Sequence, residues 1–327
     1  MPLVDPASGA AHGARVLATV RDRLADGDDV LAVAAAVADA HDALTTSLLA
    51  EAEQRLGAPP RPYAWLALGS HGRREVALGS DQDSALAYAD AGPAAAQYFA
   101  LLAEHVVGGL ERAGLPRCDG GFTATRWAQP VGELHAMFRR WVEAPDPEAL
   151  VRAEVFLDVR RVHGALDVGV LPRTLAVGGQ HGPFLAQLAR AAVHFRPPLT
   201  VFGRVRTDHG VVDVKHAGTA PIVLLARLYA LAGGVVATGT AERLAGAAAA
   251  GTLSRQGAAD LDDAYRFLLR LRLRHHVRLA GTGARLDDRV RVDALPAGER
   301  ERLRAVLRLV RDVQASAELR FAVRAVT

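Results

Sequence analysis

Cysteine is almost absent from this chain. Cys118 is the one cysteine among 327 residues, which excludes a disulfide within the chain and a zinc site built from several cysteines. We expect Cys118 to be a small, half-buried residue beside Gly120 and Gly121. Aromatic residues make up only 5% of the chain, too few for a surface on which single-stranded nucleic acid would stack.

An excess of one charge and a long apolar run are also missing. The pI is near 9.4 but the net charge is only +3, which makes nucleic acid an unexpected partner. The longest apolar run, from Ile222 to Ala237, is interrupted by Arg227 and by two glycines, so it falls short of a membrane span. The N-terminus lacks a basic flank followed by an apolar stretch, so we predict no signal peptide and a cytoplasmic location.

Lysine is nearly absent as well. Lys215 is the only lysine, and all other members of the Lys+Arg total are arginine, as a GC-rich coding bias would produce. A lysine kept against such a bias suggests a position that needs a compact, flexible ammonium group. Chance explains a single lysine equally well.

Hydrophobic residues, in contrast, make up 50% of the chain, enough for a core in one large domain or two modest ones. Apolar residues at helical spacing predict two helices within 14–56 and a mainly helical region from about residue 171 onward. Between these regions we expect a helix over 93–113 and strands over 118–125 and 156–162. No internal repeat is present.

The chemical signals lie in a stretch that begins with an apolar run, Tyr63 to Leu68, typical of a buried strand that ends at the Gly69-Ser70 turn. Asp81 and Asp83 follow. If Asp81 opens a strand, the period of two places both carboxylates on one face. Carboxylates that close repel each other, so a proton or a cation must lie between them. Mg²⁺, with Mn²⁺ as the alternative, suits such a site because it prefers oxygen ligands and substrate phosphates.

The Gly69-Ser70 turn would form the other half of this site. Gly69 lets the backbone approach a ligand closely, and Ser70 offers a hydroxyl and N–H groups to a phosphate. Arg73 adds a forked donor, and Glu75 would either assist the metal or brace Arg73. The motif is neither a P-loop nor a nucleophile elbow, because the lysine and the glycine that these need are missing. Asp-x-Asp by itself is equally typical of a surface turn.

The complete pattern resembles a known family. GSHGRRE followed by SDQD is similar to the GSxGRxE…(S/T)DxD signature of the polymerase-beta-type nucleotidyltransferase fold. In particular it resembles the signal-transduction nucleotidyltransferases related to the uridylyltransferase that modifies a nitrogen-regulatory protein. Downstream segments, from CDGGFTATRW to FLLRLRLRHH, follow in the family's order, so the resemblance covers nearly the whole chain. His71 and Ser84 depart from the family pattern at positions that flank the site.

The resemblance implies an α+β fold with three parts. These are N-terminal helices in 1–60, a polymerase-beta-like nucleotidyltransferase domain in 61–170 and a helical substrate-binding domain in 171–327. It implies a signalling enzyme that moves a nucleoside monophosphate from an NTP to an acceptor hydroxyl and releases pyrophosphate. Asp81 and Asp83 would bind the metal, whereas the turn residues named above would hold the β- and γ-phosphates.

Two further site residues are predicted from this resemblance. Polymerase-type sites generally use three carboxylates, and Asp158, at the end of an apolar run, is the candidate for the third. A salt bridge with Arg160 or Arg161 explains Asp158 equally well. The segment VDVKHAG resembles the family's Asp-Leu-Lys-x-Gly-Gly, which implies that Lys215 binds a nucleotide phosphate or the acceptor, with Asp213 orienting it.

Other interpretations stay open at this point. A degenerate member of the family would bind a nucleotide and report it to a partner without chemistry. The intact Asp-x-Asp pair opposes that reading, and the insecure third carboxylate favours it. Addition of nucleotides to RNA 3′ ends is disfavoured by the low aromatic content. The nucleobase, the acceptor (a protein or a small molecule) and a homo-oligomeric state are left undecided.

Two patterns in the helical region admit a structural explanation. Arginines at positions 266, 270, 274 and 278 form a stripe that indicates either a solvated helix face or a cationic wall facing the substrates. His275-His276 lacks the acidic partner that follows in HD-type phosphohydrolases, so we predict no metal there.

Overall fold

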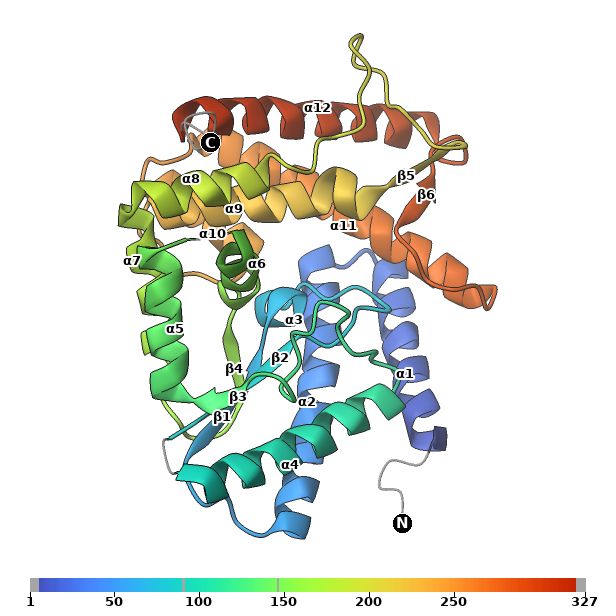
Figure 1. The fold of residues 1–327 in the computed structure, drawn as a ribbon. Coiled ribbons are helices and arrows are strands. Elements are labelled where there is room, and N and C mark those ends of the chain that lie inside the picture. The colour runs from blue at the N-terminus through green and yellow to red at the C-terminus, as the bar shows by residue number, and fades with distance from the viewer. Residues whose placement is uncertain (1–5, 90–91, 146, 322–327) are drawn as a thin grey trace. The chain divides into compact units, whose positions relative to one another are not determined.

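The structure is a computed structural model that describes residues 6–89, 92–145 and 147–321 (Figure 1). The chain falls into two compact units. The first comprises Met1–Trp141 and Val151–Leu175, and the second comprises Val142–Leu150 and Ala176–Thr327. The fold is α+β, as predicted, with a small mixed sheet and a largely helical C-terminal region.

The first unit consists mainly of helices around one four-stranded sheet. Its elements in chain order are α1 (Pro6–Ala25), α2 (Val30–Leu56), β1 (Tyr63–Ala67), α3 (Gly69–Arg73), β2 (Ser84–Tyr88), α4 (Gly92–Arg112), β3 (Ala128–Pro130), α5 (Val131–Glu143), α6 (Pro147–Phe156), β4 (Arg160–His163) and α7 (Val170–Val177). The two N-terminal helices expected within 14–56 are therefore present, and the break between them falls at Gly27, where φ is +82°.

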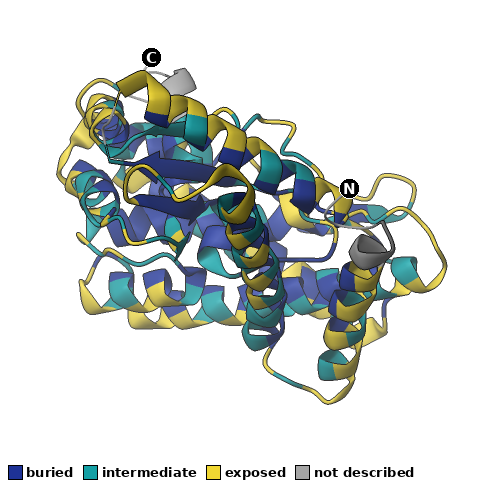
Figure 2. Cartoon of the chain, turned by 90° about the horizontal axis from the view of Figure 1, so that it is seen from below, coloured by how far each residue is buried: buried dark blue, intermediate teal, exposed yellow. Residues whose placement is uncertain are grey.

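The sheet has the strand order β3-β2-β1-β4. Strand β1 pairs antiparallel with both β2 and β4, whereas β2 and β3 are parallel. Every residue of β1 and β2 is buried (Figure 2). A strand covered on both faces needs apolar side chains at successive positions, which explains why Tyr63 to Leu68 reads as a continuous apolar run rather than an alternating one.

The core of the first unit joins this sheet to two helices. Trp65 from β1 and Tyr88 from β2 belong to one buried cluster with residues of α2 and α4. Tyr88 stacks on Phe99 of α4 with ring centroids 4.6 Å apart. A Cβ atom at Gly109 would lie 2.5 Å from the side chain of Leu48, so this glycine lets α4 approach α2 closely. The packed helices hold the central strands, and with them the segments that follow each strand, in fixed positions.

The second unit is a helical assembly with a short two-stranded sheet. Its elements are η1 (Gly178–Gln180, a 3₁₀ helix), α8 (Gly182–Ala192), β5 (Val211–Asp213), η2 (Lys215–Thr219, a π-helix), α9 (Ala220–Ala232), α10 (Thr240–Ala249), α11 (Arg255–Gly281), β6 (Arg289–Arg291) and α12 (Ala297–Arg320). The apolar run from Ile222 lies in α9, whose side chains are nearly all buried. Within the described residues, no helix is both long enough and apolar enough to cross a membrane.

One of the predicted strands is wrong, and another begins later than predicted. Residues 118–125 form turns instead, because Gly121 takes a φ of +76° that interrupts an extended chain. Phe156 ends α6, and the strand in this region, β4, begins only at Arg160. Short apolar runs do not distinguish a buried strand from a buried helix end, and here the helix forms.

Candidate active site

The turn after β1 is a single turn of helix. Leu68 is extended, and α3 follows directly at Gly69. Gly69 has a φ of +53°, a backbone conformation that favours glycine. A Cβ atom at this position would lie 2.6 Å from Oδ2 of Asp83. Glycine thus allows the turn to pack directly against this carboxylate. The hydroxyl of Ser70 is half-buried and makes no hydrogen bond with any described residue.

The backbone connects the turn to the carboxylate segment. The amide of Leu68 donates a hydrogen bond to the carbonyl oxygen of Asp83 at 3.0 Å. Gln82 is buried, and its side-chain amide donates to two backbone carbonyl groups at 3.0 and 3.2 Å. Because Gln82 points into the core, Asp81 and Asp83 on either side of it face the other way. Strand β2 begins at Ser84, after both aspartates, so Asp81 does not open the strand, but the two carboxylates still lie together.

Asp81, Asp83 and Cys118 form a group of three potential metal ligands. One ligand atom from each, a carboxylate oxygen or the sulfur, lies within 4.8 Å of the other two, and all three residues are half-buried. Two carboxylates at this spacing need a positive charge between them, so the donors fit a divalent cation. The structure therefore brings together the two aspartates predicted to bind the metal.

Sequence reasoning missed the place of Cys118 in this group. It predicted only that Cys118 is half-buried, which is confirmed. Burial, together with a hydrogen bond to the carboxylate of Asp83, raises the pKa of the thiol to about 12. The Cys118 loop is held against β2, because the amide of Ser84 donates to the carbonyl oxygen of Phe122 at 2.8 Å. No spacing in the sequence relates position 118 to position 83, so only the three-dimensional contact identifies Cys118 as a potential ligand.

Arg73 is held between two buried acidic side chains. Its Nε atom lies 2.7 Å from Oε2 of Glu75, and its NH1 group forms an ion pair with Oδ2 of Asp158. Glu75 therefore braces Arg73, one of the two roles predicted for it. Asp158 is fully buried and lies outside the group formed by Asp81, Asp83 and Cys118. A Cβ atom at Gly72 would lie 1.7 Å from the carbonyl oxygen of Asp158, so the two segments meet backbone to backbone.

Asp158 thus has an arginine partner, as one interpretation of the sequence required. This partner is Arg73, which is distant in the sequence. Arg160 instead pairs with Asp42 at 2.8 Å. The separation of 85 positions between Arg73 and Asp158 explains why the sequence pattern did not reveal this pair.

Three buried histidines lie next to one another behind the turn. The Nε2 atom of His71 lies 3.0 Å from Nδ1 of His41, and the ring of His12 lies 5.4 Å from that of His41. Burial lowers the pKa of His71 to about 4, although the charge of Asp81 raises it. Burial likewise lowers the pKa of His41 to about 3. These rings are neutral at pH 7, so His71 brings no positive charge to the two carboxylates.

Lys215 belongs to the second unit, where it begins the π-helix η2. Its side chain is exposed and makes no hydrogen bond or ion pair with a described residue. π-Helical turns are rare and often occur at functional sites. Asp213, which we expected to orient Lys215, instead accepts a hydrogen bond from the amide of His216 and pairs with the ring of His216, both at 2.9 Å.

The arginine stripe on α11 is largely paired within the second unit. Arg266 lies 2.7 Å from Asp262, and Arg274 lies 2.5 Å from Glu299. Arg278 donates to His275 at 2.8 Å. These pairs support the interpretation of the stripe as a partly solvated helix face rather than a cationic wall.

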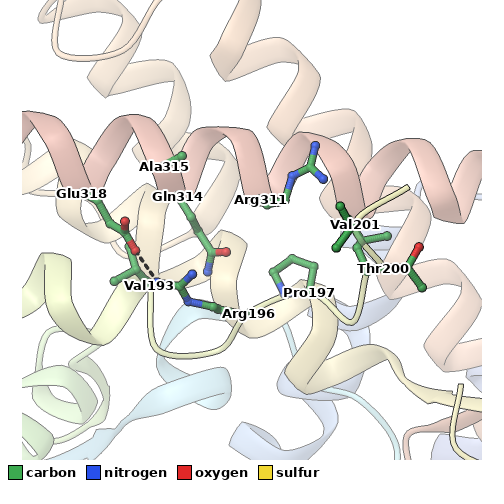
Figure 3. A pocket seen from close by; sticks show the side chains of 10 residues that line it. Val193, Arg196, Pro197, Thr200, Val201, Arg311, Gln314, Ala315 and Glu318 are labelled. Carbon is green, nitrogen blue, oxygen red and sulfur yellow. Dashed lines mark hydrogen bonds and ion pairs between the residues drawn. The ribbon is translucent and has the colours of Figure 1, made fainter. Parts of the chain in front are cut away.

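A cavity of about 340 Å³ in the second unit lies between α12 and the loop after α8 (Figure 3). Arg196 and Glu318 form an ion pair of 2.8 Å beside it. Gln314 donates to two backbone carbonyl oxygens at 2.8 and 2.9 Å. These polar groups already have partners in the protein. This cavity is therefore a weaker candidate for an active site than the group formed by Asp81, Asp83 and Cys118.

Comparison with known families supports the resemblance seen in the sequence. Residues 14–148 match the family model described as "Putative nucleotidyltransferase DUF294". Residues 182–321 match the model described as "Putative nucleotidyltransferase substrate binding domain". A search of curated proteins returned no match. The first match includes the glycine turn and the aspartate pair, and the second includes Lys215.

Proposed function

Because this chain belongs to the DUF294 nucleotidyltransferase family, we propose that it transfers a nucleoside monophosphate from an NTP to an acceptor hydroxyl. The acceptor oxygen forms a bond to the α-phosphorus while the bond from that phosphorus to the pyrophosphate oxygen breaks. The hydroxyl proton passes to solvent, and pyrophosphate leaves. A role in cytoplasmic signalling, as in the family that the sequence resembles, is part of this proposal.

The observation that carries the proposal is the group made by Asp81 and Asp83 beside the glycine turn. Two half-buried carboxylates within ligand distance of each other suit Mg²⁺ or Mn²⁺, which proteins bind through one or two carboxylates together with substrate phosphates. Such an ion, when bound, neutralises the triphosphate and stabilises the charge that develops during phosphoryl transfer. The residues of the chain have to bind the ion, bind the phosphates and fix the position of one relative to the other.

The turn residues would seat the phosphates. The backbone of Gly69 approaches Asp83 closely, so a phosphate beside this glycine would also lie near the ion. Ser70 offers a hydroxyl that makes no hydrogen bond with a described residue. Arg73 contributes a positive charge that Glu75 and Asp158 hold in one orientation. A fixed guanidinium positions a phosphate with a smaller loss of side-chain entropy than a mobile one.

Asp158 would act in catalysis by holding Arg73. Its carboxylate is fully buried and paired with that arginine, whereas a third metal-binding carboxylate would have to reach Asp81 and Asp83. Lys215 is proposed to bind a phosphate of the nucleotide or the acceptor, because it is exposed and begins a π-helix in the segment that resembles the family motif.

The arrangement of Asp158 also favours a second candidate function. With two carboxylates in the group rather than three, the protein would bind an NTP and signal its presence to a partner without transferring a nucleotide. The two functions differ in whether the α-phosphate becomes covalently attached to an acceptor.

Transfer of label from α-³²P NTPs tests the proposal. Each NTP is incubated with Mg²⁺ or Mn²⁺, the protein, and separated protein and small-molecule fractions of a cell extract as acceptor. We expect label transfer that depends on one NTP and that falls by more than about a hundredfold in Asp81→Asn, a larger loss than removal of an outer-shell partner causes. Asp119→Asn is the matched control, since Asp119 is exposed and lies outside the ligand group.

Two results would count against the proposal. Transfer that survives in Asp81→Asn would show that the aspartate pair is not the metal site. NTP binding of equal affinity in wild type and Asp81→Asn, without transfer to any fraction, would favour the second candidate function.

A further inference from the structure

The sulfur of Cys118 occupies a place that a third metal ligand would take. It lies within 4.8 Å of a carboxylate oxygen from each of Asp81 and Asp83. The position is set from outside the group, since the backbone of its loop is bonded to β2 at Ser84.

These separations match the coordination sphere of one ion. A metal bound by oxygen at about 2.1 Å and by sulfur at about 2.3 Å has ligand atoms about 3.5 Å apart at a tetrahedral angle, and about 4.4 Å apart on opposite sides. Ligand atoms that already lie within 4.8 Å of one another therefore need only a small rotation of the side chains to share an ion.

A buried atom of His71, whose ring feels the charge of Asp81, also lacks a partner. The Nδ1 atom of His71 makes no hydrogen bond with a described residue, and the side chain is 6% exposed. Among the charged groups near this ring, Asp81 acts on it most strongly. A buried polar atom without a partner marks a place where a ligand or an ordered water belongs.

We propose that Cys118 is a third protein ligand of the cation held by Asp81 and Asp83, and that it shifts the preference of the site from Mg²⁺ toward softer divalent ions such as Co²⁺, Zn²⁺ and Cd²⁺. The inference rests on the proposed function, because it concerns the same cation. Thiolate ligands select soft and borderline metals, whereas Mg²⁺ demands oxygen ligands in near-ideal octahedral geometry. Binding displaces the thiol proton to solvent, and the resulting thiolate forms the bond to the metal.

Two substitutions of Cys118 should change the metal preference of the site in different ways. Cys118→Ser keeps the size of the side chain and removes the soft ligand, so binding of Cd²⁺ should weaken by at least about tenfold while Mg²⁺ binding stays nearly unchanged. Cys118→Asp supplies a third carboxylate, so Mg²⁺ binding should strengthen relative to wild type. Near-ultraviolet circular dichroism and the melting temperature would establish that both variants fold.

Cobalt binding to the nucleotide-free protein is the decisive experiment. Co²⁺ bound to a thiolate gives a sulfur-to-metal charge-transfer absorption in the near ultraviolet. Because Cys118 is the only cysteine, such a band has one source. We expect the band in wild type, its loss in Cys118→Ser with Co²⁺ still bound, and its loss in Asp83→Asn because the ion no longer binds. Protection of the single thiol from a disulfide reagent by Cd²⁺ provides an independent measurement.

The outcomes separate this inference from the proposed function. Co²⁺ that binds in an Asp83-dependent manner without the charge-transfer band overturns the role of Cys118 and leaves the aspartate site intact. Equal Cd²⁺ affinity in wild type and Cys118→Ser overturns it as well. Absence of any Asp83-dependent binding of a divalent ion overturns both the inference and the metal site on which the proposed function depends.

Discussion

Two pairs of aspartates, one in each unit, differ in the side chains that surround them. Asp287 and Asp288 in the second unit are paired with His275 and His276, at 3.0 and 2.9 Å, and Asp288 also pairs with Arg272. In the first unit, Arg73 pairs with Glu75 and Asp158, and Asp81 and Asp83 lie beside the thiol of Cys118. The second pair is held by an arginine and two histidines and is structural, whereas the first pair lies beside a potential third metal ligand and is suited to bind a cation.

The largest effect that we expect is a loss of stability of the first unit in acid, caused by its buried histidines. Burial holds the pKa of His71 at about 4 and that of His41 at about 3, below the value of about 6.5 in an unfolded chain. As the pH falls below about 6.5, these two histidines bind protons in the unfolded chain but stay neutral in the folded first unit. The free energy of unfolding should therefore fall, by on the order of a few kcal/mol, between about pH 6.5 and pH 3.

The second unit should lose stability at lower pH. Although burial raises it, the hydrogen bond from His276 and the charge of Arg272 hold the pKa of Asp288 well below its usual range. A carboxyl with a lowered pKa contributes stability above the unfolded value of about 3.9 and loses it as the pH falls further. All three tryptophans, Trp65, Trp127 and Trp141, lie in the first unit. Tryptophan fluorescence should thus change at higher pH than the far-ultraviolet signal of the helices as a whole, and coincident transitions would contradict this.

The next largest effect tests whether Asp288 is structural. We expect Asp288→Asn to reduce the free energy of unfolding by about 2 kcal/mol, because hydrogen bonds to a charged group are lost and Arg272 keeps its charge in a half-buried place. Binding of divalent ions should be unchanged. Asp83→Asn should have its main effect on metal affinity, which falls, with a smaller loss of stability than in Asp288→Asn. Denaturant unfolding and calorimetric metal titration of both variants measure the two quantities, and similar profiles would contradict the distinction.

Sequence patterns predicted the local features of the site and missed its long-range contacts. The strand from Tyr63, the turn at Gly69 and the aspartate pair all follow from neighbouring residues, and they are present as a unit of strand, turn and strand. Cys118 and Asp158 reach the turn through folding of distant segments. Their partners depend on how the loop after α4 and the end of α6 pack against the sheet, which periodicity does not encode.

The smallest expected effect is that of replacing Gly69, the glycine that packs against Asp83. Gly69→Ala places a Cβ atom 2.6 Å from Oδ2 of Asp83 in a backbone with φ of +53°. The left-handed conformation costs about 1 kcal/mol for alanine, and the carboxylate has to rotate away from the metal position. Gly114→Ala is the matched control, because Gly114 has a φ of +91° and a Cβ atom there would meet no other atom within 4 Å. Both variants should lose similar stability in denaturant unfolding, but only Gly69→Ala should weaken metal binding, by about tenfold as for a displaced ligand. Equal metal affinity in the two variants would mean that Gly69 serves the turn alone and that Asp83 keeps its position without it.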